Sequence, residues 1–128
     1  MNSPAAPIKS VLIADDDPIF VDLATACLER DGFRTVVAND GATAIEMLLN
    51  CPVDLAIIDV LMPQIDGLRL IALIRATPQL KSLPVLIITS LEDASVQSDG
   101  MQVGANAFLT KPIDWPKLPA LVRELIAP

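Results

Sequence analysis

The chain has 128 residues, of which 16 are acidic, 9 are basic and none is histidine, so its formal net charge is −7. Hydrophobic residues make up 52% of the sequence and charged residues 20%, a balance that excludes a disordered chain and fits one domain with a buried core. The acidic excess argues against direct nucleic-acid binding, because phosphate contacts need lysine and arginine. The lack of histidine excludes imidazole-based metal sites and triads.

The N-terminus and the cysteines indicate a cytoplasmic protein. Residues 1–7 are polar and proline-rich, lack the features of a signal peptide, and are expected to form a disordered tail before a domain over residues 8–127. No apolar run reaches the ~18–20 residues that cross a bilayer, so we expect no membrane partner. Cys27 and Cys51 lie in apolar, helix-like stretches and are predicted to be reduced core thiols.

The first half of the chain alternates short apolar runs with amphipathic stretches. Strands are predicted over residues 11–14 and 33–38. A helix is predicted to begin at Pro18, where an acidic residue before a first-turn proline favours a cap, and to stop at Gly32. A second helix is predicted to begin at Asp40–Gly41 and to end before Pro52.

The second half repeats this alternation. Strands are predicted over residues 54–59, 84–89 and 107–109, and a helix over about 67–76 follows a loop at 60–66. Residues 92–103 favour a helix only weakly, because several poor helix formers interrupt them, and we predict a frayed helix there. The last helix is expected to start near Lys117, because Pro116 and Pro119 suit only its first turn.

Five strand–helix repeats, with strands that are apolar throughout, predict an α/β fold in which a parallel sheet is covered on both faces. Right-handed crossovers make this a doubly wound (βα)₅ fold, whose site lies beyond the carboxyl ends of the strands. The residues at those ends are polar: Asp15, Asp16, Asp59, Thr89 and Lys111.

These five residues together favour phosphoryl chemistry. Three carboxylates at one edge repel one another and call for a cation, and Mg²⁺ takes oxygen ligands together with a phosphate. A lysine adds positive charge, a threonine adds a hydroxyl donor, and a carboxylate is available as nucleophile. Each residue alone also has an ordinary explanation, as a helix cap, a turn, a strand end or a solvated surface charge.

Four segments in order resemble the response-regulator receiver domain of bacterial two-component signalling, of which the chemotaxis receivers are examples. The segments are residues 11–18, 54–67, 84–90 and 104–112, and the resemblance covers about residues 8–126. It implies a flavodoxin-like receiver fold with a five-stranded parallel sheet in the order 2-1-3-4-5. It also implies a signalling switch that catalyses its own phosphoryl transfer and dephosphorylation, rather than an enzyme with a separate substrate.

The resemblance assigns the acceptor and the metal ligands. It implies that Asp59 accepts the phosphoryl group. It implies that Asp15, Asp16 and Asp59, with the backbone carbonyl of Leu61, hold Mg²⁺, which Mn²⁺ can replace.

The resemblance also assigns the switch. Thr89 is expected to bond a phosphoryl oxygen, and Lys111 to pair first with the acceptor carboxylate and then with the phosphate. Phe108, where many relatives have tyrosine, is expected to follow Thr89 inward. The Lys111–Pro112 peptide bond is expected to be cis. Because phenylalanine has no hydroxyl, we expect no output contact through a tyrosine hydroxyl.

The resemblance implies a sensor histidine kinase or a phosphotransfer protein as the phosphoryl donor. It also implies a downstream protein or an output domain that the switch controls. No output sequence follows Pro128, which indicates either a stand-alone protein or a receiver cut from a longer one. A homodimer is left open.

Three other functions compete with the switch. A small-substrate aspartyl-phosphate hydrolase would have a second aspartate two residues after the nucleophile, where this chain has Leu61. A degenerate interaction module would lack some of the site residues. A flavin-binding module would carry a loop rich in serine, threonine or glycine after the first strand, where this chain has three aspartates.

Overall fold

The computed structural model describes residues 7–91 and 94–127. Its elements alternate along the chain as β1 (Ser10–Ala14), α1 (Pro18–Arg30), β2 (Arg34–Ala38), α2 (Gly41–Asn50), β3 (Leu55–Ile58), α3 (Gly67–Ala76), β4 (Val85–Thr89), α4 (Ala94–Val103), β5 (Ala107–Thr110) and α5 (Lys117–Ile126). The strands form one five-stranded sheet in the order β2-β1-β3-β4-β5, and every neighbouring pair is parallel. The predicted (βα)₅ fold and its strand order are therefore confirmed.

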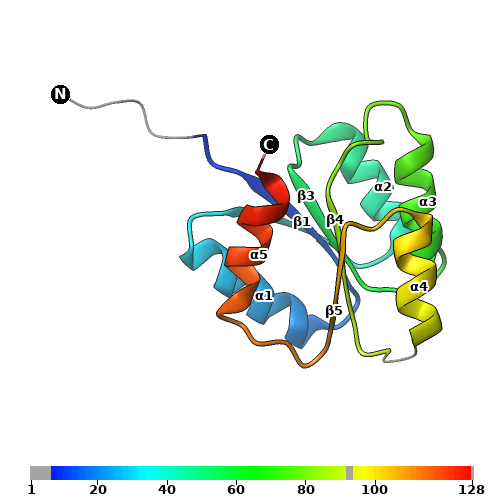
Figure 1. The fold of residues 1–128 in the computed structure, drawn as a ribbon. Coiled ribbons are helices and arrows are strands. Elements are labelled where there is room, and N and C mark those ends of the chain that lie inside the picture. The colour runs from blue at the N-terminus through cyan, green and yellow to red at the C-terminus, as the bar shows by residue number, and fades with distance from the viewer. Residues whose placement is uncertain (1–6, 92–93, 128) are drawn as a thin grey trace.

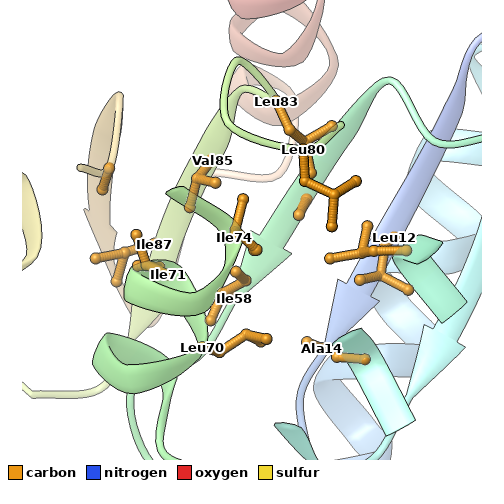
Figure 2. Close-up of a cluster of buried hydrophobic side chains, with 14 of the residues drawn as sticks. Leu12, Ala14, Ile58, Leu70, Ile71, Ile74, Leu80, Leu83, Val85 and Ile87 are labelled. Atoms are coloured by element: carbon orange, nitrogen blue, oxygen red, sulfur yellow. The ribbon is translucent and has the colours of Figure 1, made fainter. Parts of the chain in front are cut away.

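The sheet is the middle of three layers (Figure 1). Helices α1 and α5 cover one face, and α2, α3 and α4 cover the other. Side chains that alternate along the central strands divide between the two faces, so that Leu12 belongs to one apolar cluster and Val11 and Ile13 to the other. Figure 2 shows the first cluster, where Leu12, Ile58 and Ile87 of the sheet meet side chains of α3.

Among the described residues, aspartates cap helices α1, α2 and α3 at the carboxyl edge of the sheet. Asp17, Asp40 and Asp66 each accept a hydrogen bond from a backbone amide in the first turn of α1, α2 and α3, at 3.1, 2.7 and 2.9 Å. Helix α5 begins at Lys117 as predicted. Pro119 then lies in its first turn, where a backbone amide has no partner within the helix in any case.

Helix α4 forms in spite of its sequence. Its described part is Ala94–Val103, and residues 92 and 93 of the predicted span lie outside the described residues. Gly100 is buried against Ile87, and a Cβ at this glycine would press on the Cδ1 methyl of that isoleucine. The residue that weakens the helix on its own thus lets it lie close to the sheet, so tertiary packing opposes the low propensity.

Two further predictions concern the cysteines and the chain start. Both cysteines are free, as predicted, and both are partly exposed; Cys27 packs at the edge of the apolar cluster between α1 and α5. The thiol of Cys27 donates to the carbonyl of Trp115 at 3.5 Å, near the rim of the α1–α5 layer. Residues 1–6 of the expected tail lie outside the described residues. Across residues 7–91 and 94–127, no helix has the length and hydropathy that crossing a bilayer requires.

Candidate functional site

Backbone hydrogen bonds place the polar residues at the carboxyl edge of the sheet. The Asp15 amide donates to the carbonyl of Ala38 at 3.1 Å, and the Asp59 amide donates to the carbonyl of Ala14 at 3.0 Å. The Lys111 amide likewise donates to the carbonyl of Thr89 at 2.8 Å. Each bond extends a parallel ladder by one step, so these residues are held by the sheet and not by free loops.

The Lys111 side chain joins the two buried aspartates. Its Nζ lies 2.9 Å from Oδ2 of Asp15 and 3.1 Å from Oδ2 of Asp59. Asp15 is only 1% exposed and Asp59 only 5%. Two buried carboxylates need a compensating charge, and the shared ammonium supplies one positive charge for two negative ones.

The second oxygen of each carboxylate is bound by backbone. The amide of Asp17 donates to Oδ1 of Asp15 at 2.8 Å, and the amide of Leu61 donates to Oδ1 of Asp59 at 3.0 Å. Each carboxylate thus accepts one bond from the residue two positions later and one from Lys111. This arrangement fixes the rotation of both carboxyl groups, so that their Oδ2 atoms face the same point.

The electrostatics of the cluster reflect its burial. Burial raises the pKa of Asp15 above its ordinary value, and the hydrogen bonds from Lys111 and the Asp17 amide offset only part of that effect. For Lys111, burial acts to lower the pKa, but the hydrogen bonds and charges of Asp15 and Asp59 outweigh it and raise that pKa. The lysine therefore stays charged at neutral pH.

The structure gathers most of the predicted site residues but not all. Thr89 is fully buried, and its hydroxyl accepts a long bond of 3.5 Å from the Leu91 amide. The Lys111–Pro112 bond is cis. Phe108 is half-buried against the apolar cluster on the α3 side of the sheet. Asp16, in contrast, is exposed, although it follows Asp15 directly.

Gly67 shapes the loop that follows Asp59. A Cβ at this glycine would lie 2.8 Å from Cα of Val60 and closer still to the carbonyl oxygen of Asp59. Both are backbone atoms, which cannot turn aside as a side chain can. The amide of Gly67 also donates to the carbonyl of Val60 at 3.0 Å. The absence of a side chain therefore lets α3 start directly against the acceptor strand.

Two aromatic residues near the site were not among the predicted site residues. Nζ of Lys111 lies 4.2 Å from the ring centroid of Phe20, and the rings of Phe20 and Trp115 are 5.5 Å apart. Aromatic residues are rare in this chain, which has three phenylalanines and one tryptophan. That rarity was the one feature of the sequence that could have drawn attention to these two residues. Asp17, predicted only as part of a helix cap, lies 4.0 Å from Nζ of Lys111 through its Oδ2.

The carboxyl edge of this parallel α/β sheet thus carries a lysine shared between two buried aspartates together with a buried threonine, residue types that suit phosphoryl chemistry. The family model of the response regulator receiver domain matches residues 11–123, and the chain belongs to this family. Receiver domains of this family serve two-component response regulators, and phosphorylation on aspartate and dependence on Mg²⁺ are general properties of the family.

Individual relatives agree with this assignment. Response regulator GtcR of Aneurinibacillus migulanus is 42% identical over 83% of this chain and 43% of its own length. Response regulator Rre1 of Synechocystis is 36% identical over 96% of this chain and 53% of its own length. The signal receiver domain of a histidine kinase from Syntrophus aciditrophicus superimposes with a TM-score of 0.85 at 32% identity, over 92% of this chain and 89% of that one.

The chain spans about half the length of the first two relatives, so their further segments have no counterpart in the residues compared. What the chain shares with them is the receiver unit.

Proposed function

We propose that this receiver domain, over residues 8–127, accepts a phosphoryl group on Asp59 and thereby switches the state of a partner protein or an output domain. The observation that carries the proposal is the position of the Lys111 ammonium, which touches the carboxylates of both Asp59 and Asp15. A cation held there offsets negative charge at the atom where phosphorus would bind. Among the described acidic residues, only Asp59 and Asp15 combine this burial with a strand-end position and a contact to a lysine.

The reaction forms a bond between a carboxylate oxygen of Asp59 and phosphorus while the bond from phosphorus to the donor group breaks. The amide of Leu61 orients the carboxylate through its Oδ1, and Lys111 balances its charge through Oδ2. Because phosphoryl transfer depends mainly on positioning and charge neutralisation, this site needs no histidine of its own. The same residues would serve the later hydrolysis, in which a water oxygen bonds to phosphorus while the bond from phosphorus to the Asp59 oxygen breaks and the carboxylate is restored.

Mg²⁺ fits the donor chemistry of the site. Within the described ranges, no three acidic or thiol side chains converge as a metal site, but the two buried carboxylates of Asp15 and Asp59 both contact Lys111 at one edge of the sheet. Asp15, Asp59 and the carbonyl of Leu61 would hold the ion, with exposed Asp16 as a further ligand and water completing the shell. The bound ion would supply charge neutralisation for the phosphoryl oxygens, and Mn²⁺ would do the same.

The switch would act through Thr89 and Phe108. The Thr89 hydroxyl accepts a long bond from the Leu91 amide, and this bond does not use the hydroxyl proton, which could be donated to a phosphoryl oxygen. Movement of Thr89 toward that oxygen would leave space beside β4, and half-buried Phe108 on the neighbouring strand would fill it. The phosphorylated state is then favoured by contacts that the free state lacks.

The donor would be a sensor histidine kinase or a phosphotransfer protein. The phosphorylated domain would act on a separate downstream protein or on an output domain. The cytoplasmic location stays a prediction from the sequence. The family assignment favours this switch over a flavin-binding module of the same topology.

The test is the intact mass of the protein after incubation with Mg²⁺ and phosphoramidate or acetyl phosphate. We expect one added phosphoryl group on the native protein and none on Asp59→Asn. A matched control is Asp54→Asn, because Asp54 lies at the opposite end of the same strand, where it accepts from the Ser10 amide at 2.8 Å. This control should gain the group as the native protein does. A gain on Asp59→Asn, or no gain on the native protein with any donor, would overturn the proposal.

A further inference from the structure

Besides the carboxylates of Asp15 and Asp59, and that of Asp17 at 4.0 Å, the site lysine has an aromatic neighbour. Nζ of Lys111 lies 4.2 Å from the centroid of the Phe20 ring, and that ring is 5% exposed. The Lys111 side chain itself is 15% exposed, so little water competes for this face of the ammonium. The ring comes from the second residue after Pro18, in the first turn of α1.

The face of an aromatic ring attracts a cation through its quadrupole, and the attraction is strongest where water is excluded. For a contact of this kind it corresponds to roughly a two- to thirtyfold change in an equilibrium constant. Lysine has a long, flexible stem and three donors that can turn in any direction. A ring on one side of the ammonium therefore restricts the position of the charge more than two carboxylates do alone.

The ring is in turn held from another element. The indole of Trp115 packs on Phe20 with centroids 5.5 Å apart and planes inclined by 35°. The carbonyl of Trp115 accepts from the thiol of Cys27, about two helical turns along α1 from Phe20. The segment before α5 is thus tied to α1 at two points, and the orientation of the Phe20 ring follows from both.

We propose that Phe20 is a positioning residue for the phosphoryl-accepting site, holding the ammonium of Lys111 between Asp15 and Asp59 with the support of Trp115. This inference rests on the function proposed above for Lys111. When Asp59 carries a phosphoryl group, the lysine must exchange one of its carboxylate contacts for a phosphoryl oxygen. The ring contact is uncharged and need not change, so it keeps the ammonium at the site during the exchange.

The decisive experiment replaces Phe20 by phenylalanines carrying one, two and three ring fluorines. Fluorine weakens the ring quadrupole while the shape stays nearly the same, so packing is preserved. We expect the rate constant for phosphorylation by phosphoramidate, at saturating Mg²⁺ and donor, to fall stepwise along the series. The total loss should be about three- to tenfold. A rate that does not depend on fluorine content would overturn the proposal.

Phe33 provides the matched control. It is also a buried phenylalanine on the α1–α5 side and also faces a cation, Arg123, whose guanidinium carbon is 5.8 Å from its centroid. We expect Phe33→Leu to lower stability but to leave the phosphorylation rate unchanged. Phe20→Leu should lower the rate at least as far as three fluorines do. Equal rates for the two leucine variants would contradict a positioning role.

A second readout does not depend on phosphorylation. The ring current of Phe20 should shift the ε-methylene proton signals of Lys111 upfield in NMR spectra, and Phe20→Leu should abolish this shift. Absence of the shift in the native protein would overturn the contact and the proposal with it. If the shift is present but the native protein takes up no phosphoryl group, the proposed function fails, and the contact stands without a role in phosphoryl transfer.

Discussion

Replacing Lys111 by methionine removes the charge that two buried carboxylates share, while keeping most of the apolar stem. Asp15 and Asp59 are 1% and 5% exposed and would face each other without a cation. Removing one partner of a buried ion pair costs about 3–5 kcal/mol. The lysine lies at the rim with 15% of its side chain exposed, so water reaches the gap and the lower end applies. We expect Lys111→Met to lower the free energy of unfolding at pH 7 by about 3 kcal/mol.

The loss should depend on pH in a defined direction. The pKa of Asp15 is already raised above its unfolded value of 3.8, with burial as the largest cause, and removal of Lys111 takes away a contact that lowers it. A raised carboxyl pKa costs stability above the folded pKa, and this cost disappears as the pH falls to the unfolded value. The difference between the variant and the native protein should therefore shrink between pH 7 and pH 4.

Urea unfolding followed by the fluorescence of the single tryptophan measures this difference. The control is Lys117→Met, which removes an exposed lysine 3.8 Å from Asp114 and should change stability by less than about 0.5 kcal/mol. Adding Asp15→Asn to Lys111→Met should recover part of the loss, because the unpaired carboxylate is then gone. If Lys111→Met costs no more than Lys117→Met, or if its cost grows as the pH falls, the reasoning about the buried pair is wrong.

Substitutions at three further positions test packing and hydrogen bonds elsewhere in the fold. Gly67→Ala should lower stability by about 3 kcal/mol and slow phosphorylation, because its Cβ meets backbone atoms of residues 59 and 60; urea unfolding and the mass assay measure both. Hydrogen bonding from Thr43 lowers the pKa of Asp40, so Asp40→Ala should destabilise the protein at pH 7 and lose this effect as the pH falls below about 3.8, whereas Asp40→Asn should depend less on pH in the same titration. Arg75 donates to the carbonyls of residues 83 and 104 at 2.7 Å each, so Arg75→Lys should cost about 1–3 kcal/mol in urea unfolding, and no loss would contradict these bonds.

The fold could be predicted because each level of the sequence agrees with the others. Apolar runs without polar interruption predicted the strands, and an aspartate before an apolar stretch predicted the start of α1 and α2. The sequence did not predict how exposed individual apolar side chains are, because exposure depends on how the helices pack. Leu23 and Leu49 follow the helical spacing of apolar residues, yet they are 49% and 47% exposed. Periodicity locates the apolar face of a helix but does not show where its covering layer ends.

The candidate site shows a similar division. The residue types could be predicted, because the carboxyl ends of parallel strands meet at one edge. The directions of the side chains could not. Asp15 and Asp16 are the same residue type at adjacent positions, and the sequence reading treated them as equals. Asp15 continues the β1 ladder by donating to Ala38, and its carboxylate is buried, whereas Asp16 is exposed.

The contact between Lys111 and Phe20 could not be predicted either, because the two residues meet only when α1 and the end of β5 pack beside the same edge of the sheet. The consequence is that one ammonium serves two purposes at once. It compensates the buried charge of Asp15 and Asp59 in the resting protein, and in the proposed reaction it pairs with the phosphoryl group. A variant of Lys111 therefore changes stability and reactivity together. The Phe20 series separates them, because it alters the position of the charge and leaves the charge itself in place.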